Sequence, residues 1–171
     1  MKKLLAFAAL AAILAAVLTG CAAKDGKGEK NVEGTVDEIL ERVYGGLDES
    51  AQLPMLMSIP LSEDMGVAND GIRIDYYIGQ TGIPFTEGVA SEAAIGGAYS
   101  VCLLRMADGA DIEKAKADIR AGVKPDKWIC YTADTVIVDN IGDLVILIMT
   151  NNESAPGLGQ AIRDSFGKLT E

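Results

Sequence analysis

The sequence predicts an α+β domain, a two-layer sandwich with a mainly antiparallel sheet and helices packed on one face. Three observations favour this class. Apolar residues recur at helical spacing near the beginning, the middle and the end of the domain. Shorter apolar runs lie between these segments, and the last two are joined by a tight turn, as in an antiparallel hairpin. The order helix, strands, helix, strand pair, helix is typical of an α+β fold.

The first helix is predicted to begin after Thr35. Thr35 and Glu38 have the spacing of a capping box, in which each residue satisfies a free backbone N–H group of the first turn. Apolar residues then follow at helical spacing until Gly45, which is expected to end the helix. The next segment, Leu53–Leu61, is rich in methionine and bracketed by two prolines, so we expect an irregular apolar segment.

The middle of the domain is predicted to hold strands and one helix. Apolar and polar residues alternate over 72–78, which indicates a half-buried strand. Residues 89–95 fit either a strand or a weak helix, whereas the continuously apolar residues 98–106 predict a central strand. The remaining predictions are an amphipathic helix over 111–121, strands over 135–138 and 144–149, and a last helix over 158–169.

The N-terminus has the pattern of a bacterial secretory leader. Two lysines precede an apolar run, Leu4–Leu18, that is too short to span a bilayer comfortably. The residues that end it, Leu18-Thr19-Gly20-Cys21, resemble the lipobox of bacterial lipoproteins. The resemblance implies removal of residues 1–20, lipidation of Cys21 and anchoring on the extracytoplasmic side of the cell membrane. The alternatives are an uncleaved anchor helix and a leader that is cut elsewhere.

The chain is expected to continue as a tether and one globular domain. Residues 21–34 lack apolar periodicity and are rich in Gly, Lys, Ala and Glu, which is typical of a flexible tether with a reach of about 20 Å. The remaining residues, 35–171, suffice for a single core.

The charge of the chain limits its partners. The formal net charge is −10, and removing Lys2 and Lys3 with the leader leaves −12. Such a surface opposes binding to nucleic acid and to anionic lipid headgroups. The expected partners are therefore the membrane, through the lipid on Cys21, and an envelope protein, with no nucleic acid.

Few residues suggest catalysis or metal binding. The chain has no histidine, which removes the commonest general base and zinc ligand. We therefore predict no enzyme activity, no catalytic residues, no cofactor and no metal site. Two weaker candidates for a binding site remain. The first is a loop around Gly157, which could hold an anion or simply turn the chain into its last helix, and the second is a set of three acids. The acids Asp134, Asp139 and Asp143 could bind calcium weakly or be solvated turn residues.

Two cysteines remain in the predicted domain. Cys102 and Cys130 each lie within an apolar run, and outside the cell they could form a disulfide. The alternative is two small buried thiols on neighbouring strands.

From Thr35 onward, the chain resembles a family of small bacterial lipoproteins that carry a domain of unknown function (4358). The resemblance rests on the lipobox, the stretch Leu53-Pro54-Met55, a strand that leads through Asp108-Gly109 into a helix, residues 128–131, and the hairpin turn at Gly142-Asp143. It implies no known activity and therefore supplies no catalytic residues.

The functional hypothesis is a non-catalytic binding or adaptor domain for an envelope protein or component. The candidate partner-binding residues are Leu53, Met55, Met57 and Ile59, because a methionine-rich apolar segment can adapt to a partner. Packing of this segment under the sheet is the competing interpretation. The alternative function is a small-ligand or cation-binding module that assists a membrane transporter, built around Gly157 or around the acids from Asp134 to Asp143.

Overall fold

A single open sheet organises the domain. The computed structural model describes residues 31–51, 53–66 and 71–170, so the predicted leader, Cys21 and the tether as far as residue 30 lie outside the described residues. The sheet has five strands in the order β1-β2-β3-β5-β4, and every neighbouring pair is antiparallel. The strands are β1 (Leu56–Pro60), β2 (Phe85–Ala93), β3 (Tyr99–Met106), β4 (Thr135–Ile141) and β5 (Leu144–Thr150). The helices are α2 (Val36–Gly45), α3 (Ile74–Ile78), α4 (Ile112–Gly122) and α5 (Leu158–Gly167), followed by the 3₁₀ helix η1 (Lys168–Thr170).

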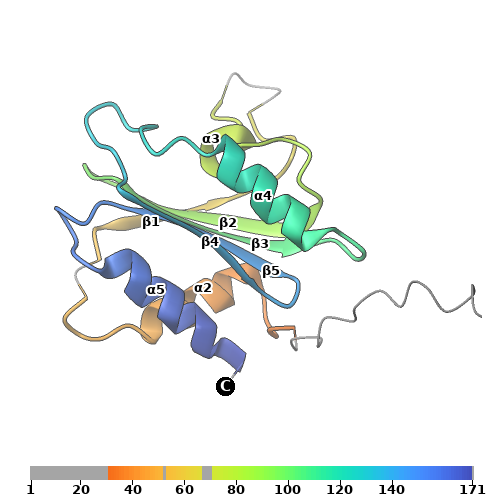
Figure 1. Ribbon diagram of the computed structural model, residues 1–171, viewed down its shortest axis with the longest axis horizontal. Helices are drawn as coiled ribbons and strands as arrows, with labels where there is room; N and C mark the ends of the chain where they lie inside the picture. The colour runs from red at the N-terminus through yellow and green to blue at the C-terminus, as the bar shows by residue number, and fades with distance from the viewer. Residues whose placement is uncertain (1–30, 52, 67–70, 171) are drawn as a thin grey trace, which may run out of the picture.

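The predicted α+β sandwich with an antiparallel sheet is confirmed, but its helices cover both faces of the sheet. Helices α2 and α5 pack on one face and α3 and α4 on the other (Figure 1). The prediction of helices on one face only is therefore wrong. The sheet is the middle of three layers, with a separate apolar core on each side.

The apolar strands β3 and β5 explain why helices must cover both faces of the sheet. In β5, Ile146 contributes to the core under α2 and α5, while its neighbour Leu147 contributes to the core under α3 and α4. Leu103 and Leu104 of β3 divide in the same way. Successive side chains of a strand point to opposite faces, so a continuously apolar strand must be covered on both. Each fully buried leucine or isoleucine contributes about 2 kcal/mol through its removal from water.

Helix α2 begins as predicted, with a complete capping box. The Glu38 backbone N–H donates to Thr35 Oγ1 at 3.3 Å, and the Thr35 N–H donates to Glu38 Oε2 at 2.9 Å. The predicted central strand, the hairpin, the middle helix and the last helix are also present, as β3, β4–β5, α4 and α5. The ambiguous residues 89–95 belong largely to strand β2.

Residues 72–78, predicted as a strand, instead contain the short helix α3. Ile74 and Ile78 are both buried, and Tyr77 is buried beside them, whereas Ile72 is exposed. A separation of four residues places two side chains on one face in a helix and in a strand alike. The alternation therefore could not distinguish the two structures, and the buried pair belongs to a helix.

The methionine-rich segment, predicted to be irregular, forms the edge strand β1. The Ala94 N–H donates to the Met55 carbonyl at 2.7 Å, and the Leu61 N–H donates to the Gly88 carbonyl at 2.8 Å. By the same register, the backbone N–H and C=O groups of Met57 and Ile59 also point toward β2. The nitrogen of Pro60, which carries no hydrogen, therefore points toward the open edge of the sheet. Proline is tolerated at such an outward position, so the prolines did not exclude a strand.

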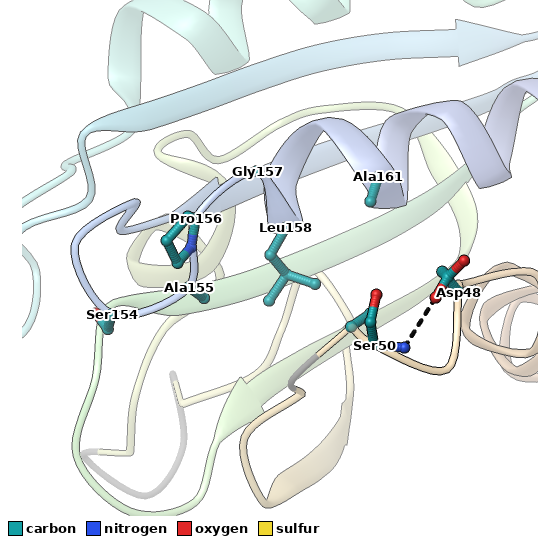
Figure 2. A pocket seen from close by; sticks show the side chains of 9 residues that line it. Asp48, Ser50, Ser154, Ala155, Pro156, Gly157, Leu158 and Ala161 are labelled. Carbon is teal, nitrogen blue, oxygen red and sulfur yellow. Dashed lines mark hydrogen bonds between the residues drawn. The ribbon is translucent and has the colours of Figure 1, made fainter.

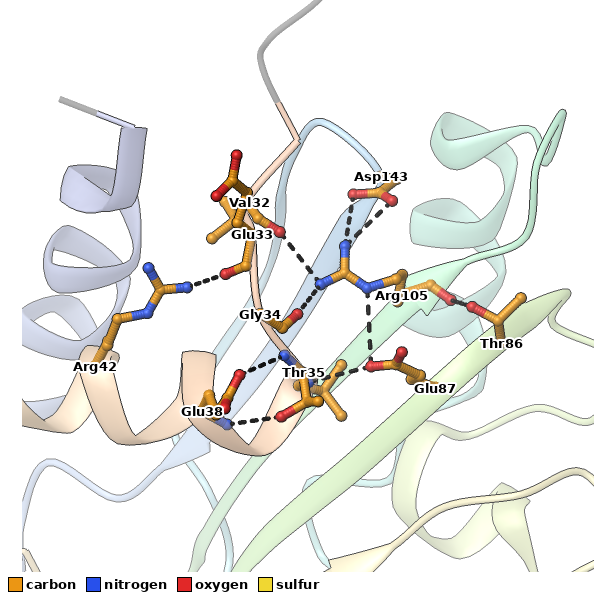
Figure 3. Close-up of polar contacts among 11 residues, drawn as sticks. Val32, Glu33, Gly34, Thr35, Glu38, Arg42, Thr86, Glu87, Arg105 and Asp143 are labelled. Atoms are coloured by element: carbon orange, nitrogen blue, oxygen red, sulfur yellow. Dashed lines mark hydrogen bonds and ion pairs between the residues drawn. The ribbon is translucent and has the colours of Figure 1, made fainter.

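The folded domain begins before the predicted boundary at residue 35. Val32 is buried, and Arg105 at the end of β3 donates to the carbonyls of Val32 (3.2 Å) and Gly34 (2.7 Å) (Figure 3). Arg105 also pairs with Asp143 at 3.3 Å, and the Asp143 N–H donates to Asn31 Oδ1 at 3.2 Å. Residues 31–34 are thus fixed to the end of the sheet and are not part of a free tether.

The close approach of α3 to α4 gives a test of this packing. Gly79, which ends α3, has φ +77°, and a Cβ there would lie 2.1 Å from the Val123 nitrogen. Gly82 has a similar φ of +74° with no atom near that position. We expect Gly82→Ala to cost about 1 kcal/mol through backbone strain. Gly79→Ala should cost at least about 2 kcal/mol more through steric overlap, as measured by urea unfolding. Equal losses would contradict the packing.

Candidate functional site

A buried ion pair lies on the face of the sheet covered by α3 and α4. Lys127 Nζ donates to Glu92 Oε1 at 2.7 Å, and only 2% and 6% of the two side chains are exposed. Ser100 completes the arrangement, because its hydroxyl donates to the same Glu92 oxygen at 2.6 Å and accepts from Lys127 at 3.2 Å. The ammonium and the carboxylate therefore neutralise each other, and both groups are hydrogen-bonded, as burial of charged groups requires.

Three aromatic rings surround the same ammonium group. Lys127 Nζ lies 4.6 Å from the ring centroid of Tyr76, 5.4 Å from that of Tyr77 and 5.0 Å from that of Trp128. The negative faces of aromatic rings attract a cation, and the attraction is stronger where water is excluded. The rings of Tyr76 and Tyr77 also meet edge to face, with centroids 5.1 Å apart. Lys127 is thus held by a carboxylate, a hydroxyl and three rings.

The ion pair fixes the connection between α4 and β4. Residues 123–134, all of which the structure describes, contain no helix or strand. Lys127 joins this connection to Glu92 of β2 and Ser100 of β3, and Trp128 packs against the core beside it. An irregular segment is thereby held in one position on the sheet.

The cluster contains the residue types of a serine–lysine dyad but is closed to substrates in this structure. Ser100 is completely buried and directs its proton to Glu92. Cys102 lies behind it, with its sulfur 3.7 Å from the Ser100 hydroxyl. A nucleophile must be reachable by the substrate and activated by a base. The geometry therefore supports a structural role for this cluster.

Large apolar side chains are exposed around the connection that Lys127 holds. Ile129 is fully exposed, and Ile95 and Met55 are 73% and 69% exposed. The exposed side chains that gather at this end of the sheet, which we name the apolar corner, are Met55, Met57, Tyr76, Ile95, Ile129 and Tyr131.

Backbone pairing and one cavity place the residues of the apolar corner at the same end of the sheet. Met55 is hydrogen-bonded to Ala94, the residue before Ile95, and Met57 lies opposite Glu92 in the sheet. A cavity of about 320 Å³ is lined by Tyr76, Ile129 and Tyr131, together with the turn between β2 and β3. Contiguous exposed apolar patches commonly mark sites of interaction.

The four predicted partner-binding residues do not form one surface. Met55 and Met57 belong to the apolar corner, as expected for exposed residues. Leu53 instead packs against the core under α2 and α5, and Ile59 against the core under α3 and α4. The sequence did not associate Ile129 and Tyr131 with the methionines, because only the pairing of β1 with β2 and the Lys127 contacts bring them together.

The region around Gly157 borders a cavity of about 340 Å³. Figure 2 shows Leu158 and Ala161 of α5 on one side and Asp48 and Ser50 on the other. The Ser50 backbone N–H donates to Asp48 Oδ1 at 2.9 Å, and this bond, with the Ser50 hydroxyl, holds the pKa of Asp48 below its usual value. Gly157 donates its N–H to Asn152 Oδ1 at 3.1 Å.

The acids proposed as an alternative cation site lie apart in the structure. Asp134 accepts hydrogen bonds from Asn152, Asp139 pairs with Arg163, and Asp143 pairs with Arg105 at the other end of the hairpin. Among the described residues, no group of three or more acids, cysteines or histidines is placed to hold a metal ion. The structure therefore does not bring these acids into the calcium site considered from the sequence.

Cys102 and Cys130 are free thiols in different environments. Cys102 is buried on β3, whereas Cys130 is exposed in the connection after α4. The candidate disulfide is not formed, and the alternative of two buried thiols on neighbouring strands holds only for Cys102. Burial raises the pKa of the Cys102 thiol to about 12.

Comparison of the chain with family models, with curated proteins and with solved structures finds no match. Within the described residues, no helix is both long enough and apolar enough to cross a membrane.

The buried ion pair can be tested by removing one charge. Lys127→Met leaves Glu92 buried without its partner, which typically costs about 3–5 kcal/mol. Urea unfolding followed by the emission of Trp128, the single tryptophan, should show this loss. Lys114→Met is the matched control, because the Lys114–Asp118 pair is exposed on α4 and its removal should change the midpoint little. Similar midpoints for both variants would contradict the role of Lys127.

The two thiols should differ in reactivity. In a Cys21→Ser chain, we expect one thiol to react with a disulfide reagent at pH 8 in the native state, and a second only after unfolding. The thiolate is the reactive form, and a raised pKa keeps Cys102 neutral at that pH, whereas Cys130 is exposed. Two rapidly reacting native thiols would contradict the burial of Cys102. No reaction without reductant would instead indicate a disulfide.

Proposed function

We propose that this chain is a lipid-anchored extracytoplasmic protein whose folded domain is a non-catalytic binding or adaptor domain for an envelope protein. The observation that carries the proposal is the apolar corner, a patch of large side chains held on a fixed support. The leader, the lipobox ending in Cys21 and the resemblance to small bacterial lipoproteins support the location.

The composition of the apolar corner suits protein recognition. Tyrosine is frequent among residues that dominate binding energy, and methionine adapts its shape to different partners. Ile129 and Tyr131 follow Lys127 and Trp128 in the chain, so the buried ion pair restrains them before a partner arrives. A surface that is already ordered loses less conformational entropy on binding.

The position of the corner supports a partner other than the anchoring bilayer. The described chain begins at Asn31, which is hydrogen-bonded to Asp143 in the turn between β4 and β5. The corner adjoins the turn between β2 and β3, at the opposite end of the sheet. Strand β3 runs between these ends, a distance of about 25 Å for a strand of its length. A tether attached at Asn31 thus joins the domain at the end remote from the corner.

Partner capture from the native membrane provides the test. The tagged, lipidated chain would be recovered from its own membranes in a mild detergent, and the co-purifying proteins quantified by mass spectrometry. We expect one enriched envelope protein, and we expect Ile129→Glu and Met57→Glu to lose it, because each places a charge in an apolar contact. Both side chains are exposed, so the stability of the domain should be retained.

Val136→Glu is the matched control, since Val136 is also exposed but lies on β4, at the other edge of the sheet. It should capture the partner as the unchanged protein does. Cys21→Ser should remove the protein from the membrane fraction. Undiminished capture by both corner variants, or no enriched protein with the unchanged chain, would overturn the proposed function.

A further inference from the structure

Two adjoining cavities form a groove beside the first turn of α5. The cavity at Asp48 has a volume of about 340 Å³, and its neighbour toward Tyr99 has a volume of about 230 Å³. They share Ser154, Ala155 and Leu158 as a common wall. We name the two together the α5 groove.

The groove exists because small residues surround it. Ala51, Gly157 and Ala161 border the first cavity, and the turn with Gly96 and Gly97 borders the second. Side chains of this size leave space at the surface that a larger residue would fill. Leucine and tyrosine at positions 158 and 99 are buried beneath it, so its floor is apolar. Binding grooves are typically apolar with few polar groups that select the ligand.

The charge of the α5 groove is negative and lies at one end. Asp48 is the one charged residue among the described residues that line the two cavities. Hydrogen bonds from Ser50 hold its carboxylate in place and favour the ionised form. The chain as a whole carries a formal charge of −10, which adds attraction for a cation. An occupant with a positive group at this end complements the groove.

The shape of the groove favours an extended occupant. The cavity toward Tyr99 shares Ala93, Gly96 and Gly97 with the cavity under the apolar corner. These two cavities lie on opposite sides of the turn between β2 and β3, because one is bordered by Tyr76 of α3 and the other by Leu158 of α5. Within the α5 groove, the two adjoining cavities can receive two side chains of one extended segment.

We propose that the α5 groove receives an extended segment of the partner protein, with small apolar side chains over Leu158 and Tyr99 and a Lys or Arg that reaches the Asp48 carboxylate. This inference rests on the proposed function, in which the apolar corner makes the main contact. The groove then determines which sequence is accepted, because a basic side chain is attracted and an acidic one is repelled.

Selection from a random peptide library tests the groove even while the partner is unidentified. The library, displayed on phage, would be selected against the full lipidated chain in nanodiscs, and the enriched peptides measured by fluorescence anisotropy. We expect a Lys or Arg at a fixed distance from small apolar residues. Asp48→Asn should weaken binding by about two- to fivefold, the value of an exposed ion pair, with a smaller effect at high salt. Ala161→Phe, which fills the first cavity, should abolish measurable binding.

Asp108→Asn is the matched control, because Asp108 is exposed in the turn after β3, at the opposite end of the sheet from the groove. It should bind the peptides as the unchanged chain does. Enriched peptides without a basic residue, equal affinity for Asp48→Asn, or no enriched peptide would overturn the inference. A small amine that raises the melting temperature only when Asp48 is present would also overturn it, in favour of a small-molecule site.

The two proposals can fail separately. If the partner is lost in Met57→Glu and Ile129→Glu but retained in Asp48→Asn and Ala161→Phe, the apolar corner binds the partner and the groove does not. If the corner variants retain the partner, the proposed function itself is overturned.

Discussion

The buried pair of Lys127 and Glu92 is the interaction on which the exposed end of this domain depends. An ammonium group can leave water only where other groups replace its hydration, and here a carboxylate, the Ser100 hydroxyl and three aromatic rings do so. The consequence extends beyond Lys127 itself. Residues 123–134 lack a helix or strand of their own to hold them, so the ion pair, Trp128 and a few backbone hydrogen bonds determine where Ile129 and Tyr131 are presented.

A second polar cluster holds the other end of the sheet. Arg105 contacts the carbonyls of Val32 and Gly34 and pairs with Asp143, so the segment before α2 is fixed where the described chain begins. Ser100 and Arg105 both belong to β3, the central strand. One buried strand therefore connects the cluster that receives the chain with the cluster that supports the apolar corner, and this gives the corner a defined position relative to Asn31.

Sequence patterns predicted those elements whose signals are local. The capping box at Thr35 and the amphipathic pattern of α4 depend on neighbouring residues, and both are present. The failures concern interactions between distant segments. The spacing of Ile74 and Ile78 fits two structures, and the outward orientation of Pro60 is set only by the register with β2. Composition alone identified Met55 and Met57 as candidate partner-binding residues. Lys127 and Glu92 are 35 residues apart, and no periodic pattern links them.

An exposed apolar patch beside an edge strand could also promote association between copies of the chain, and two features oppose this. Along the open edge of β1, only Leu56 and Ser58 have outward N–H groups, because Pro60 ends the strand and Pro54 precedes it. An edge with so few donors is a poor template for another strand. The negative charge of the chain further opposes the approach of a second copy. Both features leave the side chains of the corner, rather than the backbone of β1, as the surface that we propose binds a partner. The negative charge also favours a partner of opposite charge, which is the property that we propose Asp48 selects in the groove beside α5.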